Sequence, residues 1–130
     1  MQRERDKASA DAWLEFAEDD LTAAEALRKA NGPPQVICFP CQQAAEKGYK
    51  AYLAWHGEEN PPRTHDMALL RSKALALGAK NPPEDADELT PYATARYPGR
   101  RRVGPDEVEP AFVLAREVTA WVRKTIGGQE

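Results

Sequence analysis

Four arginines lie within seven residues near position 100, with no acidic residue between them: Arg96, Arg100, Arg101 and Arg102. A guanidinium group presents a planar fork of donors that fits phosphate oxygens. Tyr92 and Tyr97 are close by in sequence and could stack on a base. We therefore predict that this segment binds the phosphates of a nucleotide or of RNA. The alternative is a solvated loop in which Arg96 pairs with an upstream carboxylate, such as Asp85 or Glu88.

Three further side chains are candidate contacts to the same ligand. Lys47 and Lys50 are three residues apart in a predicted helix and therefore share one face. The alternative for this pair is an ordinary charged face that includes Glu46. His65 is a candidate phosphate contact, and its alternative role is local hydrogen bonding.

The two cysteines, Cys38 and Cys41, form a C-x-x-C motif ahead of a predicted helix, which resembles a thioredoxin-type redox site. The strand and helix context of such a site is missing, so we predict two structural thiols and keep a thiol oxidoreductase as an alternative. Zinc would need His56 and His65 as further ligands, but eight residues separate them, outside finger-type spacing. We predict no metal site, no cofactor and no catalytic residue.

The elements that must position these side chains are predicted to be helices. Ala occurs 22 times and Leu 10 times, against 14 residues of Val, Ile and Thr together, a composition that favours helix over strand. Apolar residues recur every three or four positions, for example Trp13, Phe16/Ala17 and Leu21 in the first segment. Thr64 is the expected N-cap of the third helix. The predicted helices cover residues 9–30, 35–56, 64–77, 82–97 and 106–126.

These elements indicate one all-α domain, an up-and-down antiparallel bundle of four to five helices. We expect a charged N-terminal tail over residues 1–8, the bundle over residues 9–126 and a C-terminal tail over residues 127–130. No apolar stretch approaches the ~20 residues of a membrane span, and no secretory signal is apparent. With a formal charge of −3 and two cysteines, we expect a cytoplasmic protein with reduced thiols and no membrane partner.

Four ordered motifs resemble those of the HEPN family. The most recognisable is Cys38-Phe39-Pro40-Cys41-Gln42-Gln43-Ala44-Ala45-Glu46-Lys47. It is preceded by Ala17-Glu18-Asp19-Asp20-Leu21 and followed by Pro62-Arg63-Thr64-His65-Asp66-Met67 and by Ala95-Arg96-Tyr97-Pro98. The resemblance covers residues 9–126, and it departs from the family at Gly48, where alanine is usual, and at Pro40-Cys41 in the first turns of the second helix.

The resemblance implies a HEPN-like bundle, and family members are either catalytic or non-catalytic. Ribonuclease members carry an arginine followed four to six residues later by histidine, whereas His65 has only Arg63 two residues before it. The chain therefore resembles the non-catalytic branch, whose members often accompany small nucleotidyltransferases in pairs like those of toxins and antitoxins. We expect a homodimer that binds a nucleotide or RNA and has such a partner. A divergent ribonuclease and a purely structural interaction domain are the alternatives.

Overall fold

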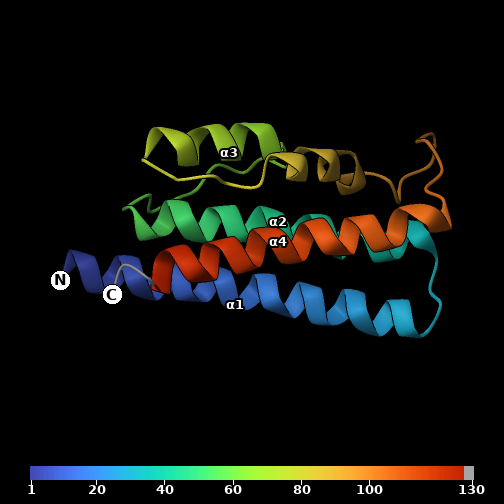
Figure 1. Cartoon of the computed structure of the whole chain (residues 1–130), viewed down its shortest axis with the longest axis horizontal. Helices are drawn as coiled ribbons and strands as arrows, with labels where there is room; N and C mark the ends of the chain where they lie inside the picture. The colour runs from blue at the N-terminus through green and yellow to red at the C-terminus, as the bar shows by residue number, and fades with distance from the viewer. Residues whose placement is uncertain (128–130) are drawn as a thin grey trace.

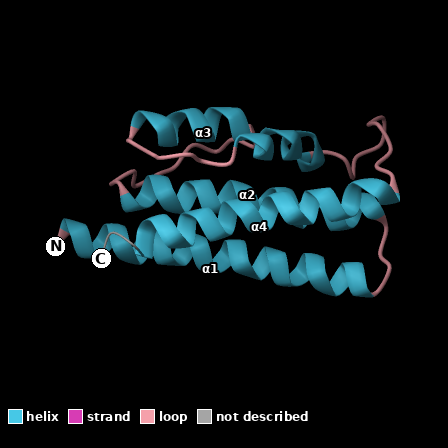
Figure 2. Ribbon diagram, in the orientation of Figure 1, coloured by secondary structure: helices cyan, strands magenta, loops and turns pink. Residues whose placement is uncertain are grey.

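The computed structural model describes residues 1–127, in which helices are the regular secondary structure (Figure 2). Three long α-helices are α1 (Gln2–Lys29), α2 (Pro34–Trp55) and α4 (Val108–Gly127). Between α2 and α4 lie the short helix α3 (Met67–Ala76) and two 3₁₀ helices, η1 (Glu84–Ala93) and η2 (Pro105–Glu107). The predicted all-α bundle is confirmed. None of the described helices is both long and apolar enough to cross a membrane.

The three long helices lie side by side, and α3 and η1 form a second layer against α2 (Figure 1). Helix α1 is antiparallel to α4, because Arg28 near its end pairs with Glu109 and Glu18 pairs with Arg123. Helices α2 and α4 run in the same direction, whereas we expected consecutive long helices to alternate. The intervening residues 56–107 bring the chain back to the end of the bundle where α2 begins, which makes this direction possible.

Helix α2 occupies the centre of the molecule and is buried over most of its length. Its side chains Tyr49, Tyr52 and Leu53 are at most 1% exposed. Pro40 lies inside this helix, beyond the first turn, and the helix continues through it. Burial on all sides explains why a helix with an internal proline is stable here, since packing outweighs the cost of one missing backbone hydrogen bond.

Several predicted boundaries are corrected by the structure. Helix α1 begins at Gln2, so the residues expected as a tail before Ser9 are helical. The Arg3 guanidinium lies 3.7 Å from the ring centroid of Trp55 and donates to the Trp55 carbonyl, which ties this first turn to the end of α2. Asp66, not Thr64, accepts the N-cap hydrogen bond of α3, from the Leu69 amide.

The second layer is tied to the long helices by specific hydrogen bonds. The Tyr49 hydroxyl donates to the carbonyl of Pro83 at 3.0 Å, and the Trp121 indole donates to that of Lys80 at 2.9 Å. Within this layer, Arg71 of α3 forms a two-pronged ion pair with Asp87 of η1. The fourth predicted helix is a shorter 3₁₀ helix, η1. Side chains that are distant in sequence, such as Arg71, hold it in place.

Candidate functional site

The arginine loop, residues 96–103, connects η1 to η2 at the end of the bundle where α2 begins (Figure 1). Residues 95–103 and Gln35, the second residue of α2, line a hollow of about 300 Å³. Gly99 in this loop has φ of 86°, a left-handed conformation that glycine adopts without strain. The structure thus brings all four predicted arginines to one concave surface.

Arg96 is held against aromatic rings instead of a carboxylate. Its guanidinium carbon lies 3.7 Å from the ring centroid of Phe39 and 5.8 Å from that of Tyr97. The alternative pairing with Asp85 or Glu88 does not occur, and stacking on a ring leaves the edge donors of the guanidinium available. Tyr97 is 55% exposed and also lines the hollow.

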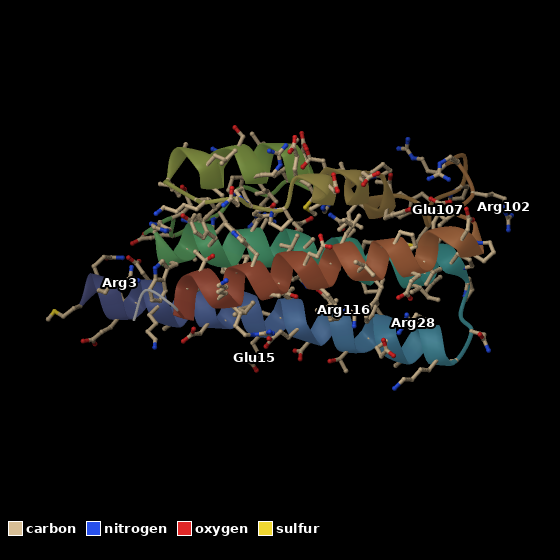
Figure 3. The ribbon with its side chains drawn as sticks, in the orientation of Figure 1. Arg3, Glu15, Arg28, Arg102, Glu107 and Arg116 are labelled. Atoms are coloured by element: carbon tan, nitrogen blue, oxygen red, sulfur yellow. The ribbon has the colours of Figure 1, made fainter. Side chains whose placement is uncertain are left out.

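Arg100 and Arg102 are exposed at the outer part of the loop, and Arg102 lies at the edge of the molecule (Figure 3). Among residues 1–127, no carboxylate lies within ion-pair distance of Arg96, Arg100 or Arg102. These three guanidinium groups therefore give the hollow a net positive charge that no nearby acid neutralises.

Arg101 differs from its neighbours, because both of its terminal nitrogens donate to Glu107, at 2.8 and 2.9 Å. The same carboxylate accepts from the Tyr92 hydroxyl at 2.7 Å and from the Gly104 amide at 2.8 Å. Hydrogen bonds from Arg101, Gly104 and Tyr92 lower the pKa of Glu107 to about 2. Burial and the hydrogen bond to Glu107 raise the pKa of Tyr92. Glu107 is therefore ionised and Tyr92 neutral at physiological pH.

Lys47, Lys50 and His65 each contact a carboxylate of the long helices, and the His65 side chain is itself 59% exposed. Lys47 pairs with Asp20 of α1 at 2.8 Å, and Lys50 pairs with Glu46 at 2.8 Å. The His65 Nδ1 lies 2.7 Å from the other oxygen of Glu46. The structure does not bring these three residues to the arginine loop.

The alternative interpretation, in which Lys47 and Lys50 form an ordinary charged face with Glu46, is wrong for two of these residues. Glu46 is only 5% and Lys50 only 6% exposed. Gln42, fully buried, also donates to Glu46 at 2.9 Å. Burial alone would raise the pKa of Glu46, but hydrogen bonds from Lys50, His65 and Gln42 lower it below its ordinary value. The carboxylate is thus kept charged inside the bundle.

Cys38 and Cys41 are buried free thiols in α2. Burial raises the pKa of Cys38 to about 11, and burial together with the neighbouring Cys38 raises that of Cys41 to about 12. A reactive thiol needs a lowered pKa and access to solvent. These properties favour structural thiols over the redox alternative.

Two important residues of this region, Glu107 and Phe39, were not predicted from the sequence as site residues. Glu107 follows Gly104 and Pro105 at the start of the last helix, and an acid in this position often bonds a free backbone amide. That pattern could have identified its contact with Gly104. Its pairing with Arg101 and the stacking of Arg96 on Phe39 have no comparable sequence signal.

The loop, its cations and its anchoring carboxylate are thus part of a bundle that spans nearly the whole chain. A family model described as "HEPN domain" matches residues 10–125. The chain belongs to the HEPN family. HEPN domains in general have functions connected with nucleotides or RNA, and they often form dimers. No curated protein matches the chain closely. In this HEPN domain, the arginine loop contains the fourth of the motifs noted in the sequence, Ala95-Arg96-Tyr97-Pro98.

Proposed function

We propose that this HEPN domain is a non-catalytic module that binds RNA or a nucleotide at the arginine loop. The observation that carries the proposal is the hollow lined by Arg96, Arg100 and Arg102, three arginines without a carboxylate partner among residues 1–127. Guanidinium groups in an open hollow suit phosphate oxygens, and the exposed ring of Tyr97 can stack on a base. Family membership supports the same class of ligand.

The proposed ligand contacts differ among the candidate residues. Arg96, Arg100, Arg102 and Tyr97 are the contacts we propose. Arg101 and Tyr92 are both bonded to Glu107, so we assign them to holding the loop. Lys47, Lys50 and His65 are bonded to Asp20 and Glu46 and are not proposed as ligand contacts.

Titration with fluorescently labelled single-stranded RNA of about ten nucleotides tests the proposal. Each phosphate neutralised by an arginine contributes about −0.7 to the slope of log K against log salt. We expect the Arg100→Ala, Arg102→Ala double variant to bind more weakly and to have a slope smaller in magnitude by about 1.4, because two contacts are lost. Labelled ATP and GTP, titrated in parallel, show whether a mononucleotide suffices.

A matched control is the Arg5→Ala, Lys124→Ala double variant. Both residues are exposed cations outside the arginine loop, so the variant has the same net charge as the loop variant. It should bind RNA as the wild type does, within about twofold, because distant exposed charges are screened by salt. Equal loss in both variants, or no binding of RNA or nucleotide by the wild type, would contradict the proposal.

We also propose that the protein acts with a small nucleotidyltransferase, in a pair like those of toxins and antitoxins. The resemblance to the non-catalytic branch supports this partner. A nucleotidyltransferase encoded by the neighbouring reading frame, and copurifying with the chain when the two are expressed together, is the expected observation. Its failure to copurify would favour a module that acts alone.

A further inference from the structure

The carboxylate of Glu107 accepts four hydrogen bonds from three parts of the chain. Oε1 accepts from Tyr92 at the end of η1 and from one nitrogen of Arg101. Oε2 accepts from the other terminal nitrogen of Arg101 and from the backbone amide of Gly104. Two-pronged arginine to carboxylate pairs are stronger and more directional than single hydrogen bonds. One side chain of η2, directly before α4, thus anchors the loop.

Two of the groups bonded to Glu107 lie in the sequence on either side of Arg102, one of the unpaired arginines. Arg101 directly precedes Arg102, and Gly104 follows it after one residue, so Glu107 holds the Arg101 side chain on one side of Arg102 and the Gly104 backbone amide on the other. At its other end, the loop is held by the stacking of Arg96 on Phe39 of α2. Glu107 and Arg102 lie at the same end of the molecule (Figure 3).

Electrostatics alone would disfavour a carboxylate at this place. Glu107 contributes a negative charge beside a hollow that we propose to bind phosphate, and a like charge weakens anion binding. Its side chain is 22% exposed, so solvent does not fully screen that charge. Its contribution must therefore be geometric if it favours binding, and ligand sites gain affinity when their contacts are fixed beforehand.

We propose that Glu107 is a positioning residue that holds the arginine loop in its phosphate-binding shape, with Arg101 and Tyr92 as its partners. This inference rests on the proposed function for its role in binding. It assigns Arg101 to the loop's internal structure, whereas its neighbours Arg100 and Arg102 are left to contact the ligand.

Glu107→Gln tests the inference, because a geometric role and an electrostatic role of Glu107 predict opposite changes in RNA affinity. The amide keeps the size of the side chain, but its NH₂ group cannot accept from Arg101 or Gly104. We expect RNA affinity to fall roughly tenfold, as for other residues that orient contacts, and we expect Tyr92→Phe to cause a smaller loss. Circular dichroism checks that the helices remain folded. Affinity equal to or higher than that of the wild type would overturn the inference.

Glu88→Gln is the matched control. Glu88 is an exposed acid of η1, and within the described residues it has no ion pair, so its replacement removes the same charge without an anchor. RNA affinity should be unchanged or slightly higher. A tenfold loss in this variant would also overturn the inference.

Amide hydrogen exchange without RNA separates the inference from the proposed function. Exchange of the Gly104 amide and of residues 100–103 should be at least about tenfold faster in Glu107→Gln than in the wild type, because the anchoring bonds are lost. If the wild type binds no RNA or nucleotide, the proposed function fails, and this measurement still decides whether Glu107 orders the loop. Unchanged exchange would overturn the inference.

Discussion

Glu46 and Lys50 of α2 form an ion pair that is buried in the bundle. Both side chains are nearly inaccessible, at 6% and 7% of their side-chain surface. Desolvating two charges is unfavourable, and their mutual attraction offsets that cost only when the geometry is good and the remaining lone pairs are satisfied. Here Gln42 and His65 satisfy the second oxygen of Glu46. The stability of the central helix therefore depends on the complete network.

Replacing Glu46 by alanine should lower the free energy of unfolding by about 3–5 kcal/mol, because the Lys50 ammonium is left buried without its partner. Urea denaturation followed by circular dichroism measures this change. Glu109→Ala is the control: its pair with Arg28 is on the surface, and its loss should cost at most about 1 kcal/mol. A cost below about 1 kcal/mol for Glu46→Ala would contradict the role we assign to the network.

The lowered pKa of Glu46 predicts how the stability of the protein changes with pH. The pKa of Glu46 is lower in the folded state than its ordinary value of 4.5, so the folded state favours the ionised form. The stabilisation is fully present above that value and is lost as pH falls through the folded pKa. Between pH 7 and pH 3, the melting temperature of the wild type should fall more than that of Glu46→Gln. Equal falls would show that another group controls acid unfolding.

At the scale of elements, α2 and α4 approach closely at Gly48. A Cβ atom built there would lie 3.2 Å from Cγ1 of Val118 and 3.7 Å from Cγ2 of Val122. The absence of a side chain lets these two parallel helices pack together at this turn. The close approach explains the departure from the alanine expected by resemblance to the family.

Gly48→Val should therefore destabilise the protein by about 1–3 kcal/mol, because the added methyl groups overpack this contact. Urea denaturation measures the effect. Gly127→Val is a suitable control, since a Cβ there meets nothing within 4 Å. The Gly48→Val, Val118→Ala double variant should recover part of the loss, and no recovery would mean that the contact is not its cause.

At the scale of the whole molecule, large apolar side chains remain on the surface. Phe16, expected on the inner face of the first helix, is 58% exposed, while its neighbour Ala17 is buried. Leu69, Leu75 and Leu77, in and just after α3, are 40–46% exposed. Exposed apolar side chains of this size are common where subunits meet.

We therefore expect sedimentation velocity at micromolar concentration to show a dimer. Phe16→Ser and Leu75→Ser distinguish the two apolar regions, because only a substitution in the interface should shift the molecule toward monomer. The surface variant Ala120→Ser serves as the control and should sediment as the wild type does, since it only adds a hydroxyl group to an exposed side chain. A monomer in the wild type would contradict this prediction.

The sequence alone determined the helical class, the central helix and the cluster of arginines. Helix periodicity and turn residues are local properties, so residues 35–56 were located to within a residue of α2. Charge is likewise a local property, and the four arginines of the loop do line one hollow. The resemblance to the HEPN family could be recognised from the sequence, because its motifs are short and follow one another in order along the chain.

Only the tertiary structure decided which of these charged residues are free. Lys50 and Arg101 look like solvated cations in the sequence, but packing buries Lys50 together with Glu46 of the same helix, and the loop brings Arg101 to Glu107. The direction of α4, the exposure of Phe16 and the stacking of Arg96 on Phe39 also depend on packing. Helix periodicity identifies the apolar face of a helix but not the segment that packs against it. Burial and tertiary contacts depend on segments far apart in the chain.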